Sequence, residues 1–508
     1  MAPRPPHPFP SLQRLRADWW PGGIPRELLA GAVATFALIP EVIAFAFVAG
    51  VDPAVGLFAS FVISLVIAFA GGRPAMISAA AGSVALVAAP LVQSHGLPYL
   101  LAAGALAGLV QVAFGLLRMG VLMRFVSSSV RTGFVNALAV LIFSAQLPHL
   151  RGAGAATWAM LALGLAIIYG LPRLGLRAFA VVPSPLVCIL ALSAVAAALG
   201  LPLPTVSDLG RLPEALPAFG LPAVPLAWET LRIVALPALA IAMVGLLESM
   251  MTASVVDEMT GTPSSKNREA AGLGAANVAA SLFGGIAGCG MIGQTVSNIR
   301  YGGRGRLSTL FAGAFLLVLM VALKPWVSKV PVIALVAIMV MVSIATFDWK
   351  SLGALVRHPR SSSLVMLATV AVTLATHNLA AGVGVGVVLS GVFFASKVAR
   401  MLDVRAEDDP ATGARAWTVS GQVFFASADA FVEAFDVLDA ECRAVRIDVS
   451  GAHFWDVTAV GALDKVVRRL RQHGCTVDVV GLNRASAVLV DRLGTGGPEA
   501  AAAVSLRK

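Results

Sequence analysis

The chain has 508 residues, of which 58% are hydrophobic and 13% charged, and its formal net charge at pH 7 is +10. Soluble globular proteins carry roughly 25% charged residues, so this composition excludes a wholly soluble protein. The basic excess lies among apolar segments, where loops of membrane proteins collect Lys and Arg, and so it does not predict nucleic-acid binding. Charged residues are sparse up to residue 400 and frequent from 401 to 508, which predicts a membrane body followed by a soluble domain.

Residues 1–25 contain Arg and Pro but no short apolar run before a cleavage site, and they predict a cytoplasmic arm. Residues 26–400 predict a polytopic helical membrane domain with about fourteen spans, because a helix needs ~20 residues to cross a bilayer. The regular apolar segments are 28–48, 54–70, 98–117, 121–145, 156–172, 182–199, 231–253, 307–324, 330–346, 363–376 and 379–396. Three further segments, 78–92, 269–286 and 290–303, are short or rich in Gly and other small residues.

A Pro-rich polar stretch, 201–225, interrupts the membrane body near its middle and predicts a loop. Because seven segments precede it and seven follow, we expect two inverted repeats, of about 26–200 and 228–400. The third segment of each half is the interrupted one, in 71–90 and in 284–300. This matched position is the sequence evidence for the repeat.

The two interrupted segments predict an anion site. Non-helical backbone inside a membrane is tolerated only where it is buried in protein or lines a wet cavity. A helix that begins there directs free N–H groups and partial positive charge into the cavity. The alternative is that the small residues only let helices pack closely, as Gly104 and Gly108 would; the matched pair favours the anion site.

Two acidic residues, Glu41 and Glu248, lie within apolar runs. Ionisable groups in such positions are costly and tend to be functional. Thr252 lies four residues after Glu248 and so on the same helical face, where a carboxylate and a hydroxyl could share a proton or a cation. The alternative is a protonated glutamic acid that bonds a neighbouring helix. The four cysteines are too scattered for a CxxC metal site or a disulfide framework.

The chain contains no motif for nucleotide-driven transport or for catalysis. The run 302–309 is glycine-rich but lacks the order of a phosphate-binding loop. We therefore expect no enzyme activity and no cofactor, and transport that draws on ion or substrate gradients.

The C-terminal part, 401–508, alternates strands with helices and predicts a small α/β domain. Strands are expected in 414–427 and 442–454 and in the apolar run after residue 474, and amphipathic helices in 428–441 and 457–474.

These residues resemble a known family. The segments 38–46, 50–61, 245–261, 267–285 and 289–310 resemble SulP anion transporters, also called solute carrier family 26, and 447–463 is similar to a STAS domain. The resemblance implies a core domain, a gate domain, a homodimer and elevator-like alternating access. It places the anion between the third and tenth spans, where Ser78, Ala79 and Ala80 would start one half-helix, Gly290, Met291 and Ile292 the other, and Gln294 would add a donor.

The resemblance also assigns coupling and regulatory residues. Glu248 and Thr252 match positions that help to hold sodium in bicarbonate carriers, although Glu replaces the usual Asp. Glu41 fits a proton-coupled bacterial symporter better than an exchanger. Thr458 occupies the position that is phosphorylated in some stand-alone STAS domains.

The predicted function is secondary active transport of a small anion (sulfate, bicarbonate or a dicarboxylate) with H⁺, across the lipid bilayer of a bacterial inner membrane. The N-terminus and the STAS domain are expected in the cytoplasm. The alternatives are an uncoupled anion channel, a Na⁺-coupled bicarbonate symporter, and a membrane-anchored signalling protein whose STAS domain is the active part.

Overall fold

The computed structural model describes residues 18–121, 126–174, 184–209, 218–225, 227–409, 414–435, 444–493 and 504–505. The chain divides into two compact units, Met1–Val387 and Val388–Lys508, which are described separately. Most of the expected N-terminal arm, residues 1–17, lies outside the described residues. The division falls inside the last apolar helix, and the first strand of the C-terminal domain begins at Asp403.

The first half of the membrane unit is helical apart from one short strand. Its elements are α2 (Ile24–Ala49), α3 (Pro53–Ala70), β1 (Ser78–Ala80), α4 (Gly82–His95), α5 (Leu97–Leu116), α6 (Ser128–Ser144), the short α7 (Leu147–Leu150), α8 (Ala155–Gly170) and α9 (Ser184–Leu199). The regular apolar segments predicted in this half all form helices, because each is long enough and apolar enough to satisfy its backbone internally beside lipid.

The second half repeats this order, with its short strand again third among the predicted segments. Its elements are α11 (Trp228–Thr260), α12 (Lys266–Leu282), β2 (Gly288–Gly290), α13 (Ile292–Arg300), α14 (Arg306–Val327), α15 (Val332–Thr346), α16 (Lys350–Arg357), α17 (Arg360–Thr376) and α18 (Leu379–Ala399). Among the described residues, eight helices are long and apolar enough to cross a membrane, and three shorter apolar helices accompany them. The count of fourteen spans stays a prediction.

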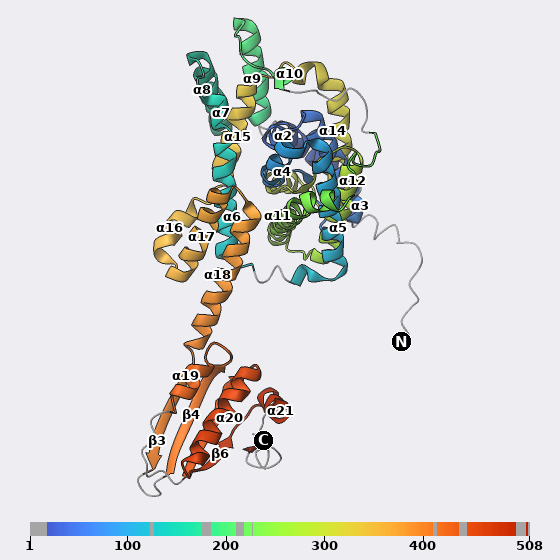
Figure 1. Cartoon of the computed structure of the whole chain (residues 1–508). Helices are drawn as coiled ribbons and strands as arrows, with labels where there is room; N and C mark the ends of the chain where they lie inside the picture. Colours follow the sequence, from blue (N-terminus) through green and yellow to red (C-terminus); the bar gives the residue numbers. More distant parts are fainter. Residues whose placement is uncertain are drawn as a thin grey trace, which may run out of the picture. The chain divides into compact units, whose positions relative to one another are not determined.

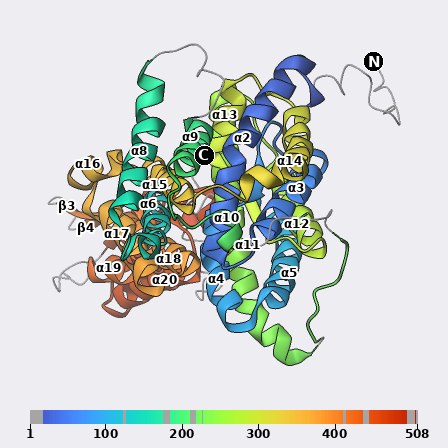
Figure 2. The same cartoon turned by 90° about the horizontal axis from the view of Figure 1, so that it is seen from above.

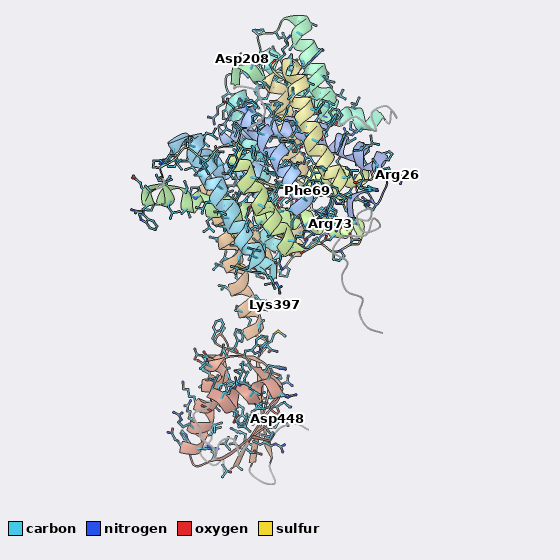
Figure 3. All side chains as sticks on the ribbon, turned by 90° about the vertical axis from the view of Figure 1, so that its right-hand side faces the viewer. Arg26, Phe69, Arg73, Asp208, Lys397 and Asp448 are labelled. Atoms are coloured by element: carbon cyan, nitrogen blue, oxygen red, sulfur yellow. The ribbon has the colours of Figure 1, made fainter. Side chains whose placement is uncertain are left out.

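The stretch between the halves, expected to be a loop, contains one short helix, α10 (Val206–Leu209). Asp208 accepts hydrogen bonds from the backbone N–H of Thr205 (2.7 Å) and from its hydroxyl (2.8 Å). These two donors lower the pKa of the Asp208 carboxyl, because they stabilise its charged form. Figure 3 shows Asp208 at one end of the membrane unit and Arg73 toward the other.

The helices of the membrane unit form two groups. Figures 1 and 2 show α2, α3, α4, α5, α11, α12 and α14 packed together on one side, with α13 against α2 and α11, and they show α6, α8, α15 and α17 on the other side. We call the first the core group and the second the gate group. The core group contains both strands and both helices that follow them, so the interrupted segments lie within one packed body.

The two short strands pair with each other, although about two hundred residues separate them. They run antiparallel, with Ser78 opposite Gly290 and Ala80 opposite Gly288. On the β1 side, the Ser64 hydroxyl donates to the Ser78 carbonyl (2.9 Å), and the Ala80 N–H donates to the Ser60 hydroxyl (3.2 Å). Hydroxyls of α3 thus satisfy backbone groups that the strand pairing leaves free.

The β2 side is held by side chains of α11 and α12. The Gly290 N–H donates to the Ser249 hydroxyl (2.9 Å), and the Thr252 hydroxyl donates to the Gly290 carbonyl (2.9 Å). The Asn277 amide accepts from the Gly288 N–H (2.8 Å) and donates to the Gly288 carbonyl (3.1 Å). Polar residues scattered through apolar helices therefore serve a non-helical backbone buried in protein.

We predict that Asn277→Ala destabilises the membrane unit. The change leaves the N–H and the carbonyl of Gly288 without partners in a buried place, at about 1–3 kcal/mol for each unpaired group. Thermal unfolding of the purified protein in detergent measures the loss. Ser144→Ala is the control, because Ser144 is exposed and its hydroxyl bonds only the Val140 carbonyl of its own helix. Equal melting temperatures for both variants would contradict this account of Asn277.

Two buried carboxylates, Glu27 and Glu269, hold loops that connect helices of the core group. Glu269 accepts from the N–H groups of Gly72 (2.7 Å) and Arg73 (2.9 Å), just before β1. Glu27 likewise accepts two N–H bonds, each of 2.9 Å, from the loop before α14. Both acids are structural, and they lie outside the long apolar runs that drew attention to Glu41 and Glu248.

The second unit is an α/β domain with one five-stranded sheet. Its elements are β3 (Asp403–Asp409), β4 (Ala414–Val423), α19 (Ala428–Glu433), β5 (Ala444–Phe454), α20 (Val457–Gln472), β6 (Thr476–Val480), α21 (Arg484–Leu493) and β7 (Val504–Ser505). The strand order is β3-β4-β5-β6-β7, with β3 antiparallel to β4 and the other pairs parallel. The helices α19 and α20 pack on the sheet through Phe431 and Leu463, which are buried in its core.

The structure of this domain contains one strand that the sequence did not predict, and it describes one expected helix only in part. Strand β3 was not predicted, because its acidic sequence has a low strand propensity; pairing along β4 over seven residues overrides it. The helix expected over 428–441 is present as α19, and residues 436–441 lie outside the described part of the chain.

Candidate functional site

A cavity of about 300 Å³ lies in the membrane unit at the start of the two helices that follow the strands. Core and gate groups both contribute to its wall. The lining residues are Glu41, Phe45, Gly82, Ser83, Phe134, Val135, Leu138, Ile142, Glu248, Met251, Met291, Ile292, Gly293, Gln294, Met341, Val342, Ala345 and Thr346.

The N-termini of α4 and α13 both open on this cavity. Helix α4 begins at Gly82 and α13 at Ile292, and neither cap residue, Ala81 or Met291, bonds the first turn through its side chain. The first N–H groups of a helix have no intrahelical partner, and they carry a partial positive charge equivalent to roughly +0.5 at each end. Because β1 and β2 are antiparallel, the two helices leave the strand pair in opposite directions, with their N-termini at one cavity.

Four residues predicted to bind the anion lie in the strands instead. Ser78, Ala79 and Ala80 form β1 and Gly290 ends β2, and none of the four lines the cavity. The prediction that Ser78–Ala80 start a half-helix is wrong, since their backbone is extended by pairing with β2 and α4 begins only at Gly82. Gly290 likewise precedes α13.

The other predicted contacts lie at the cavity. Met291, Ile292 and Gln294 all belong to its lining. They lie in or just before the first turn of α13.

Glu248 of α11 lies on the cavity wall and meets donors from both interrupted segments. Its Oε2 accepts from the Ser83 hydroxyl in the first turn of α4, and from the Cys289 thiol of β2, with Sγ 3.1 Å away. The Cys289 side chain is fully buried. Neither donor was predicted from the sequence, because a lone Ser and a lone Cys in small-residue segments carry no spacing signal.

Thr252 follows Glu248 by one turn but does not line the cavity. Its fully buried hydroxyl donates to the Gly290 carbonyl and so fixes the end of β2. The two residues therefore do not act together as expected. Glu248 lines the cavity, whereas Thr252 bonds the backbone of β2.

Glu41 of α2 supplies the second carboxyl of the cavity, and it is hydrogen-bonded to the Gln294 side chain of α13. The remaining wall is largely apolar and includes Phe45, Phe134 and Met341. Among the described residues that line the cavity, none is Lys, Arg or His. The partial positive charge at this cavity is therefore that of the two helix N-termini.

In the second unit, Thr458 is exposed in the first turn of α20. The preceding Asp456 caps this helix, with its carboxylate accepting from the Ala459 N–H (2.8 Å). The role of Thr458 as a phosphorylation site stays a prediction.

Fold and cavity together are those of a helical membrane protein whose cavity is lined by two packed groups of helices. The Sulfate permease family model matches residues 24–159 and 153–369, and the STAS domain model matches 409–496. The protein YbaR of Bacillus subtilis (strain 168), which carries a sulfate-transporter name, is 48% identical over 479 residues, 94% of this chain and 98% of YbaR. The chain belongs to the sulfate permease family, also called SulP or solute carrier family 26, with a C-terminal STAS domain, and it is an anion transporter and not an enzyme.

Two solved structures share the fold. The inward-facing murine Solute Carrier 26 family member A9 anion transporter superposes with a TM-score of 0.81 at 18% identity, covering 99% of this chain and 94% of that one. The transmembrane domain of the cyanobacterial bicarbonate transporter BicA gives 0.62 at 24% identity, covering 72% and 97%. At these identities the likeness concerns the fold alone.

Proposed function

We propose that this protein is a secondary active transporter that carries one small anion together with a proton. The observation that supports the proposal is the cavity itself, where two uncapped helix N-termini and two carboxyl side chains, Glu41 and Glu248, share one wall. The helix ends attract an anion, and a carboxyl can take up and release a proton. A proton bound with the anion neutralises charge that would otherwise be costly in the low dielectric of the membrane.

The contacts of Glu248 favour H⁺ over Na⁺ as the coupled ion. Hard cations such as Na⁺ prefer several oxygen ligands, whereas Oε2 of Glu248 already accepts from a hydroxyl and a thiol. The second oxygen expected for sodium, that of Thr252, lies outside the cavity lining. The Na⁺-coupled bicarbonate symporter is the second candidate, because the bicarbonate transporter BicA of Synechocystis sp. is 26% identical over 473 residues, 84% of this chain.

Alternating access by an elevator motion fits the division of the cavity wall. Gly82, Glu248 and Ile292 belong to the core group, whereas Phe134 and Met341 belong to the gate group. A displacement of one packed group against the other would carry the anion without rebuilding the helix ends that hold it.

Charge placement supports an orientation with the STAS domain in the cytoplasm of a bacterial cell. Because α17 and α18 are successive apolar helices joined at His377 and Asn378, we place the chain that follows α18 on the same membrane side as Arg360, the first residue of α17. Lys and Arg collect on the cytoplasmic side, and Lys350 and Arg357 are found just before α17. We place the N-terminus on the same side and expect a homodimer, which mass photometry in detergent can test.

Uptake into proteoliposomes that contain the full-length protein tests the proposal. Sulfate, bicarbonate and a dicarboxylate are offered with an inward H⁺ gradient, an inward Na⁺ gradient or neither, at a clamped membrane potential. We expect accumulation only with the H⁺ gradient. Accumulation driven by Na⁺ would assign the second candidate, and flux that follows only the gradient of the anion would indicate a channel.

A further inference from the structure

We infer that the cavity selects a singly charged carboxylate with a short aliphatic chain over sulfate or any other divalent anion. The inference rests on the proposed function, whose site it specifies. It is carried by three properties of the same cavity: its charge, the chemistry of its wall and its volume.

The charge of the wall matches one negative charge and not two. The helix ends at Gly82 and Ile292 together are equivalent to roughly one positive elementary charge. The described lining residues supply no cationic side chain that would add to this, and they include the acids Glu41 and Glu248. A dianion would therefore keep about one uncompensated charge away from water, which is costly in a low dielectric.

The chemistry of the wall favours an anion with an apolar part. The lining also includes the side chains of Phe45, Phe134, Met251 and Met341, which offer no hydrogen-bond donor. Sulfate presents oxygens in every direction, so some would point at this apolar wall unpaired. A carboxylate places both oxygens toward the N–H groups and its carbon chain against the Phe and Met side chains, as in other small-molecule sites.

The volume leaves room for that chain. About 300 Å³ is at the lower end of the range of small-ligand pockets and corresponds to roughly ten waters at ~30 Å³ each. A carboxylate group occupies only part of this space.

Binding, and not flux, is the measurement of choice, because short fatty acids also cross lipid in their neutral form. The purified full-length protein in nanodiscs is titrated with the sodium salts of acetate, propionate and butyrate, and with sulfate and bicarbonate, at one pH and ionic strength. Thermal shift gives each dissociation constant. We expect affinity to rise about fourfold for each added methylene, the worth of one buried CH₂, and sulfate to bind more weakly than butyrate.

Phe134→Ala removes an aromatic part of the wall, and we expect it to reduce the gain per methylene while acetate affinity changes little. Phe134→Leu, which keeps an apolar side chain, should retain most of the gain. Phe143→Ala is the matched control, because Phe143 lies on the same helix, is 42% exposed and does not line the cavity. An unchanged series in folded Phe134→Ala and Phe134→Leu would overturn the assignment of the wall.

The outcomes also separate this inference from the proposed function. Sulfate or bicarbonate binding more tightly than butyrate, together with its H⁺-driven uptake, would overturn the inference and leave the proposed function standing. Butyrate binding with the expected series, but with no H⁺-driven uptake of any anion, would support the inference and overturn the coupling.

Discussion

Glu248→Gln is expected to abolish H⁺-driven accumulation of the anion in proteoliposomes, down to the level of protein-free vesicles. The amide keeps the size of the side chain and can still accept from Ser83 and Cys289, which meet the carboxyl in the native protein. It cannot bind and release a proton in the physiological pH range. The substitution thus removes the coupling step while it preserves the packing.

A matched variant on the same helix makes this result specific. Glu258→Gln also replaces an acid of α11, but Glu258 is exposed near the end of the helix and does not line the cavity. It should accumulate the anion as the native protein does. If Glu248→Gln accumulates anion to the native level, Glu248 is not the coupling residue, and Glu41 becomes the group to test.

Ile292→Glu is expected to weaken anion binding about a thousandfold. Ile292 is the first residue of α13 and lines the cavity, so a carboxylate there would lie beside the bound anion and compete for the N–H groups. Two like charges ~4 Å apart repel by about 4 kcal/mol at an effective dielectric constant of 20, and 1.4 kcal/mol is a tenfold change in affinity. Thermal shift of the purified variant measures the dissociation constant.

The control for this substitution is Ile292→Leu, because swaps between Ile and Leu conserve volume and usually cost less than ~1.5 kcal/mol. It should bind with near-native affinity. Circular dichroism of both variants establishes that they are folded. A native dissociation constant in folded Ile292→Glu would show that the anion does not bind at the start of α13.

Local sequence was sufficient for the helices and for part of the site. A long apolar run satisfies its own backbone only as a helix in lipid, so α2, α3 and α5 could be placed from hydropathy alone. An acid within such a run is exceptional, and Glu41 and Glu248 were found for that reason. The α/β fold of the C-terminal domain was also predicted, because helix and strand periodicities alternate within it, whereas its STAS assignment came from the resemblance of residues 447–463.

The remaining part of the site depends on contacts between residues that are far apart in the chain. Ser78 and Gly290 are extended because each strand finds its partner in the other half. Ser83 reaches Glu248 from the other half of the chain, and Cys289 reaches it from strand β2. Phe134 joins the wall from the gate group. Hydropathy and residue spacing describe only residues that are near each other in the chain. The pairing of β1 with β2 depends instead on which distant segments can satisfy each other's buried polar groups. The sequence by itself therefore determined the helices and the two acids, and only the tertiary structure decided which atoms line the cavity.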